Sequence, residues 1–125
     1  MISSHEIKNI DKQEYKDINE YTFNKAVKLG NLEYMKILRD NGHPFSRNTF
    51  GYAALSGNLE IMIWLKENGC TFSKYTFCFA ALCGNLENMK WLKNNGCQFD
   101  EYTFDDAIKN GNLENIKWLK DNGCS

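Results

Sequence analysis

A fixed period of 27 residues constrains this chain more than any other feature. The pair Thr-Phe starts at positions 22, 49, 76 and 103, and each start lies 27 residues after the previous one. Gly-Asn-Leu-Glu starts at 30, 57, 84 and 111, and Asn-Gly starts at 41, 68, 95 and 122, in the same register. Constant self-similarity of this size is the signature of stacked repeat proteins. The sequence therefore predicts equivalent units that bury their apolar faces against one another.

Each unit is predicted to form two helices joined by tight turns. A glycine such as Gly84 ends the first helix in the left-handed conformation, and the asparagine after it, such as Asn85, caps the second helix. Apolar residues at three- and four-residue spacing indicate one buried stripe per helix. No segment alternates with period two, so the expected fold class is all-α, a solenoid of stacked helix-turn-helix repeats without β-hairpin fingers. The residues expected to cap the four first helices are Asn19, Ser46, Ser73 and Asp100.

The period also divides the chain. Residues 1–17 are predicted to form a degenerate N-terminal capping half-unit, because they are polar and Glu6 aligns with Glu33 one period later. The repeat domain is predicted to cover residues 18–125, with units at about 18–45, 46–72, 73–99 and 100–125. The last unit stops directly after Asn-Gly-Cys without a closing cap, which leaves open that the chain is a fragment of a longer repeat protein.

Composition argues against nucleic-acid and membrane partners. The chain has 15 basic and 16 acidic residues, a net charge of −1, and no basic run that could follow a phosphate backbone. No apolar run approaches the roughly 18–20 residues that span a bilayer, and the N-terminus has no apolar segment of the secretory type. Trp64, Trp91 and Trp118 could stack bases only with a positive groove beside them, so they are expected to pack between second helices.

Five cysteines, an odd number, point to a reducing compartment. Cys70, Cys97 and Cys124 occupy the same repeat position, so stacking places them roughly 10 Å apart, beyond the ~7 Å that a disulfide spans between Cα atoms. We expect free thiols, with Cys78 and Cys83 as small packing residues, and a cytoplasmic location. No cysteine or histidine pair has metal-ligand spacing, so no metal and no cofactor are expected.

The other reactive side chains also lack the spacing that catalysis needs. Asp105 and Asp106 are adjacent and diverge around a helix, which argues against an acid/base pair. His43 stands where other units have cysteine and is expected to be a solvent-exposed turn residue, while His5 lies in the N-terminal segment. Neither histidine has a nucleophile placed beside it by the repeat. The sequence therefore predicts that the protein is not an enzyme.

The residues of a unit resemble the ankyrin repeat core. The resemblance rests on Ala-Ile-Lys-Asn-Gly-Asn-Leu-Glu at 107–114, Ile-Lys-Trp-Leu at 116–119 and Asn-Gly-Cys at 122–124, and it extends over about residues 18–125. Tyr-Thr-Phe at 21, 75 and 102 stands where that family has Thr-Pro-Leu. The Trp-Leu-Lys-x-Asn-Gly-Cys ending is similar to ankyrin-like repeats of giant DNA viruses and some protists. A viral origin would imply the host cytoplasm.

The resemblance implies a monomeric, non-catalytic protein that binds a protein partner. Ankyrin units have 33 residues, however, and these have 27. The missing six fall where the family has its β-hairpin finger, which supplies many of its partner contacts. The first helices are therefore the expected contact surface. The alternative is a purely structural array, or a fragment of a longer repeat protein, that binds nothing on its own.

Positions that vary between units are the candidates for partner recognition. The outer units are polar at these positions and the inner two are largely apolar. Two explanations stay open: Tyr52, Leu55, Phe79 and Leu82 are buried between neighbouring units, or they form an exposed patch with aromatic anchors. The partner-binding residues proposed from the sequence are Lys25, Lys28, Leu29, Tyr52, Leu55, Ser56, Phe79, Leu82, Cys83, Asp106, Lys109 and Asn110.

Overall fold

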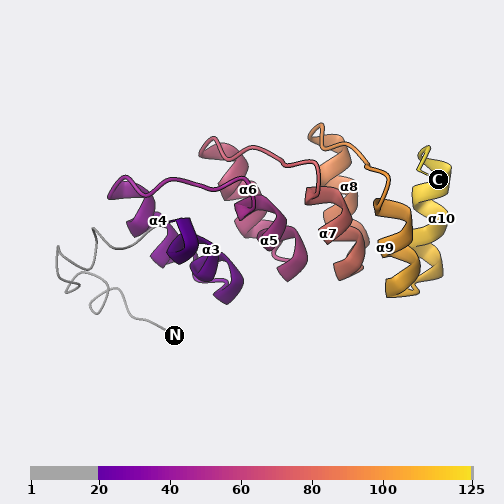
Figure 1. The fold of residues 1–125 in the computed structure, drawn as a ribbon, viewed down its shortest axis with the longest axis horizontal. Helices are drawn as coiled ribbons and strands as arrows, with labels where there is room; N and C mark the ends of the chain where they lie inside the picture. Colours follow the sequence, from indigo (N-terminus) through magenta and orange to yellow (C-terminus); the bar gives the residue numbers. More distant parts are fainter. Residues whose placement is uncertain (1–19, 125) are drawn as a thin grey trace.

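The computed structural model describes residues 20–124, in which four helix pairs stand side by side in one row, with the connecting segments along one edge (Figure 1). The half-unit predicted at residues 1–17 and the cap Asn19 lie outside the described residues. Within that range no strand occurs, so the all-α repeat architecture is confirmed. The helices are α3 (Glu20–Leu29), α4 (Leu32–Asp40), α5 (Thr49–Ser56), α6 (Leu59–Glu67), α7 (Thr76–Cys83), α8 (Leu86–Asn94), α9 (Thr103–Asn110) and α10 (Leu113–Asp121).

The turn inside each pair has the predicted chemistry. Gly84 ends α7 with a φ of +84°, a conformation that glycine adopts without a steric penalty. The Asn85 side chain then accepts a hydrogen bond from the backbone N–H of Asn88, at 3.1 Å, and so caps α8. The same glycine and asparagine positions close the other three pairs.

Three of the four first helices begin later than predicted, whereas α3 begins at Glu20, directly after the predicted cap position 19. The prediction placed the start of α7 directly after Ser73, but the helix begins two residues later than that, at Thr76. Ser73 caps a separate preceding turn: its backbone N–H donates to Thr76 Oγ1 at 2.9 Å, and its hydroxyl accepts from the N–H of Tyr75 at 3.2 Å. That turn is closed by a bond between residues three apart, which is tighter than an α-helical turn. Ser46 and Asp100 make the equivalent bonds.

Aromatic side chains connect each pair to the next. Phe50 of α5 is fully buried and meets the ring of Phe72, in the following connecting segment, edge-on with centroids 4.6 Å apart. It also stacks on Trp91 of α8 at 6.2 Å. Such pairs stabilise by about 0.5–1.5 kcal/mol beyond the area they bury. The aromatic partners of the tryptophans are thus phenylalanines of the preceding pair and of the connecting segment.

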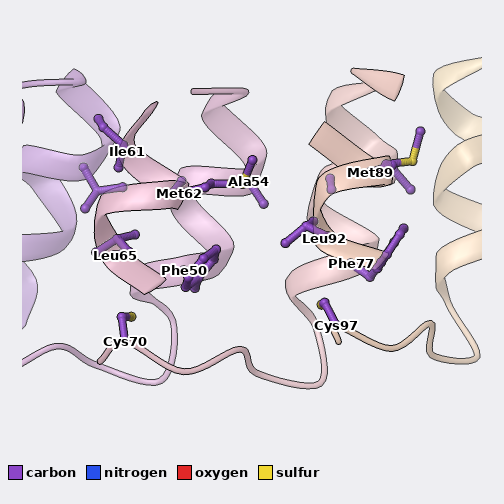
Figure 2. Close-up of a cluster of buried hydrophobic side chains, with 14 of the residues drawn as sticks. Phe50, Ala54, Ile61, Met62, Leu65, Cys70, Phe77, Met89, Leu92 and Cys97 are labelled. Atoms are coloured by element: carbon purple, nitrogen blue, oxygen red, sulfur yellow. The ribbon is translucent and has the colours of Figure 1, made fainter. Parts of the chain in front are cut away.

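Small side chains bring the first helices close together. Ala53, Ala54, Ala80 and Ala81 are all buried, and α5 packs directly against α3 on one side and α7 on the other. The second helices approach one another less closely. Figure 2 shows the core that results, with Phe50, Met62 and Leu65 of one pair and Phe77, Met89 and Leu92 of the next filling the space within and between the pairs.

The prediction that His43 is exposed was wrong, because only 7% of its surface is accessible. The backbone N–H of His43 donates to the carbonyl of Leu38 at 3.1 Å, as Cys70 does to Leu65 at 2.9 Å. This bond belongs to the Schellman turn after a left-handed glycine, in which the residue following the glycine packs back on the helix. His43 is therefore buried for the same reason as the cysteines at this position.

Candidate interaction surface

The structure places the proposed recognition residues on four adjacent helices. Each of α3, α5, α7 and α9 packs against the next, so residues one period apart lie in rows across them. We call these twelve residues the first-helix face. The first row is Lys25, Tyr52, Phe79 and Asp106; the second is Lys28, Leu55, Leu82 and Lys109; the third is Leu29, Ser56, Cys83 and Asn110.

The two inner helices expose apolar side chains in the second row. Leu55 and Leu82 are each 39% accessible, so neither is part of the core. Tyr52 and Phe79 are half-buried and pack against the core cluster. The two explanations drawn from the sequence therefore each hold in part: the leucines face solvent, and the aromatic residues are half-buried against the core.

Phe79 lies on α5 because the residue beneath it is a glycine. A β-carbon on Gly51 would stand 2.7 Å from Cδ2 of Phe79, closer than real contacts allow. Gly51 thus lets the aromatic ring of one unit cover the helix of the preceding one. The sequence contained a signal for this contact, since Gly51 is the one glycine inside a first helix.

A cation lies over the other aromatic residue of the first row. Lys28 Nζ is 4.2 Å from the centroid of the Tyr52 ring, within cation–π range. The hydroxyl of Ser56 donates to the carbonyl of Tyr52 at 2.9 Å. Lys25 and Lys28 are both exposed, so the α3 end of the first-helix face is basic.

The α9 end of the face carries both charges. Lys109 Nζ lies 3.7 Å from an oxygen of Asp106, three residues earlier on the same helix. The lysine side chain is 71% accessible and the aspartate 18%, and an ion pair with one partner in water contributes little to stability. The face therefore runs from a basic end, through an apolar centre, to an end of mixed charge.

The third row lies at the seams between pairs. Cys83 Sγ would be 3.0 Å from a β-carbon on Gly57, so the thiol fills the space beside the turn of the preceding pair. Asn110 donates through Nδ2 to the carbonyl of Leu82 at 3.3 Å. Both residues thus make contacts between pairs. Leu29, at 63% accessible, is the large apolar member of this row that stays open to solvent.

Two exposed tyrosines extend the face and were missed in the sequence. Tyr75 and Tyr102 are 41% and 50% accessible. The carbonyl of Tyr75 accepts from the N–H of Phe79, so the backbone is helical there and the two rings are one turn apart. Lys74 Nζ lies 5.0 Å from the Tyr75 centroid. The signal in the sequence is the aromatic residue directly before Thr-Phe.

Three of the buried cysteines have thiols that resist ionisation. Burial raises the pKa of the Cys70 and Cys97 thiols to about 12, and that of Cys78 to about 12 with Asp100 adding to the effect, so these thiols are protonated at neutral pH. Among residues 20–124 no three His, Cys, Asp or Glu side chains are grouped to hold a metal ion. In the same part of the chain, no helix is long and apolar enough to cross a membrane.

A scan against protein-family models gives no match to this chain, and a search of curated proteins gives none either. The architecture of residues 20–124 is thus that of a regular helix-turn-helix repeat.

Proposed function

We propose that this protein is a non-catalytic scaffold or adaptor that binds a protein partner through the first-helix face. The observation that carries the proposal is the exposed pair Leu55 and Leu82, each three residues after the half-buried Tyr52 or Phe79, on the two inner of four adjacent helices. A centre of apolar and aromatic side chains with a polar, charged rim is the usual anatomy of a protein interface.

The energetics favour a partner with its own apolar side chains. Each Å² of apolar surface removed from water contributes about 25 cal/mol, so covering the two leucines and the exposed edges of the aromatic residues would supply a few kcal/mol. The lysines at the α3 end favour acidic residues at one end of the partner's binding segment. The exposed rings of Tyr75 and Tyr102 would add contact area with little loss of side-chain entropy.

The proposal includes the family of repeat proteins to which the chain belongs. We propose an ankyrin-type protein with shortened units, similar to repeats of giant DNA viruses and some protists, that acts as a monomer in the cytoplasm, or in the host cytoplasm if it is viral. The support is the 27-residue helix-turn-helix unit and the motifs Gly-Asn-Leu-Glu and Trp-Leu-Lys-x-Asn-Gly-Cys. Buried, protonated thiols are compatible with a reducing compartment.

The test compares partner capture by matched variants. Tagged parent protein and the double variant Leu55→Glu/Leu82→Glu are incubated with extract of the native cells, and retained proteins are identified by mass spectrometry. We expect at least one protein that the parent retains and the variant loses, because two carboxylates at the centre of the face would be desolvated by a partner.

A control variant separates the face from a general effect of charge. Ile63→Glu adds a carboxylate at an exposed position, 37% accessible, on the second helix α6. This variant should retain the same proteins as the parent. A folded Leu55→Glu/Leu82→Glu variant that keeps every partner would refute the proposal. Loss of helical circular dichroism in the same variant would show instead that the leucines are part of the core.

A further inference from the structure

The last helix pair exposes apolar side chains that the other pairs bury. Ile108 of α9 is 51% accessible, whereas its equivalents Val27, Ala54 and Ala81 are at 0%. Leu113 of α10 is 81% accessible, whereas the corresponding leucines of the earlier pairs are half-buried. Ile116 is half-buried, whereas the methionines at its position are at 0%. We call Phe104, Asp105, Ile108, Leu113 and Ile116 the α9–α10 end face.

Phe104 shows what would cover this end face. In each earlier pair, the equivalent phenylalanine meets two further rings, one from the next connecting segment and one from the next pair's second helix. Phe77, for example, lies 4.6 Å from Phe99 and 6.4 Å from Trp118, by ring centroids. Phe104 is half-buried, and no ring within residues 22–124 makes these two contacts with it. Among the described residues, Phe104 therefore lacks the two ring contacts that its equivalents make with the next pair.

Asp105 adds a polar requirement to the same end face. Its equivalent in the first pair, Asn24, is buried and accepts a hydrogen bond from Thr49 Oγ1 at 2.7 Å, while its amide donates to Ser46 Oγ at 3.1 Å. Asp105 is exposed and has two carboxylate oxygens in that position. A carboxylate can accept from both hydroxyl groups of a Ser-x-x-Thr turn.

We propose that the α9–α10 end face docks another helix pair of this 27-residue type, one with an aromatic residue in its connecting segment, a Ser-x-x-Thr turn and a tryptophan on its second helix. All three interfaces in this molecule supply the template for the aromatic contacts, and the first interface supplies the template for the polar contact. A second copy of this chain fits less well, because its first pair has Ile37 where the later pairs have tryptophan.

The experiment extends the full chain by one pair and measures the effect on α9 and α10. A copy of residues 72–97 placed directly after Ser125 continues the period and supplies Phe72, Ser73, Thr76 and Trp91 in register. We expect a single melting transition with Tm raised by at least about 4 °C. Amide hydrogen exchange in α9 and α10 should slow at least about ten-fold, because the next pair covers them. A second transition with unchanged exchange in α9 and α10 would overturn the proposal.

Two controls identify the contacts responsible. In the first, the copies of Phe72 and Trp91 in the extension are replaced by alanine, and the gain in Tm and the slower exchange should both be lost. In the second, Ile108→Glu should shift Tm by less than about 2 °C in the parent, since the side chain is exposed, but should remove most of the gain in the extended chain. An equally small effect of Ile108→Glu in both chains would refute docking at this face.

Sedimentation equilibrium of the parent chain addresses the competing occupant. We expect a monomer at micromolar concentration, because the chain's own first pair lacks the tryptophan. Concentration-dependent association that Ile108→Glu abolishes would show that a second copy occupies the end face, and it would overturn the occupant proposed here.

Discussion

The third and fourth helix pairs have nearly the same sequence pattern but differ in what they bury. Phe77 and Ala81 of α7 are fully buried between neighbours on both sides. Their equivalents on α9, Phe104 and Ile108, have a neighbour on one side and stay partly accessible. A residue's contribution in such a stack therefore depends on the next pair as much as on its own unit, as expected when stability is a sum of intrinsic and nearest-neighbour terms.

The third and fourth pairs have the same geometry in the hydrogen bonds and turns that form within a pair. Asn85 and Asn112 each accept from the N–H three residues on, both at 3.1 Å. Gly84 and Gly111 have φ values of +84° and +82°. Comparing equivalent substitutions in the third and fourth pairs thus separates what a unit contributes alone from what its neighbour adds.

The largest difference is expected for the buried phenylalanine. Phe77→Ala should lower the free energy of unfolding by about 3–5 kcal/mol, because it removes a fully buried ring and its contacts with Phe99 and Trp118. Phe104→Ala should cost about 2 kcal/mol, because that ring is only half-buried. Urea denaturation followed by circular dichroism measures both. Equal costs would mean that the contacts with the next pair contribute nothing.

The next difference is expected at the glycines. Gly84→Ala and Gly111→Ala should each cost about 1–2 kcal/mol, because alanine resists a positive φ. Gly84→Ala should cost about 1 kcal/mol more, since its β-carbon would stand 2.7 Å from Cγ of Asn110 and displace that amide from the carbonyl of Leu82. No atom lies within 4 Å of a β-carbon on Gly111.

A second substitution tests the cause of that excess. In the background Asn110→Ala the clash partner is gone, so Gly84→Ala and Gly111→Ala should become equally costly. If the excess cost at Gly84 persists in that background, it comes from the backbone of α7 rather than from the neighbouring pair.

The buried thiols of the third and fourth pairs should make the free energy of unfolding depend on pH to different extents. Burial, with Asp100 adding to it, raises the pKa of Cys97 to about 12, whereas an unfolded thiol titrates near 8.5. The protonated folded thiol therefore stabilises the fold fully below about pH 8.5, and this contribution is lost as pH rises toward 12. From pH 8 to pH 10.5, the cost of Cys97→Ala should fall by about 2 kcal/mol.

Cys124 provides the matched residue in the fourth pair. Burial raises its pKa as well, but its pair has no described neighbour on the far side. We expect a smaller fall in the cost of Cys124→Ala over the same pH range, measured by urea denaturation in parallel. A fall as large as that of Cys97→Ala would show that burial by the following pair does not control these thiols.

Features whose partners lie within a few residues could be predicted from the sequence. The all-α repeat, the left-handed glycines and the asparagine caps depend on contacts inside one turn, and these predictions were confirmed. The starts of α5, α7 and α9 were misplaced because a tighter turn, such as the one in which Ser73 bonds to Thr76, precedes each of these helices. The burial of His43 was missed because its environment is set by the turn geometry, not by its residue type.

The candidate surface was only partly predictable, because its shape depends on contacts one period apart. The twelve positions follow from comparing units, and Leu55 and Leu82 are exposed. Phe79 can pack against α5 because Gly51 in the preceding unit has no side chain. Tyr75 lies in the turn just before α7, where its carbonyl accepts from the N–H of Phe79. Sequence periodicity identifies equivalent residues, but it does not give the rotation of one pair against the next that decides their exposure.

The smallest difference is expected at the helix caps, where the two pairs should agree. Asn85→Ala and Asn112→Ala each remove one bond from the side chain to the first turn of the second helix, a loss of about 1 kcal/mol. The bond is local and has the same length in both pairs, so the costs should match within about 0.5 kcal/mol. A clearly larger cost for Asn85→Ala would mean that the fourth pair, whose Asn115 donates to the carbonyl of Gly84 at 2.7 Å, holds the cap in place. The distinction between local and neighbour contributions drawn from the two pairs would then fail at the contact where it should be clearest.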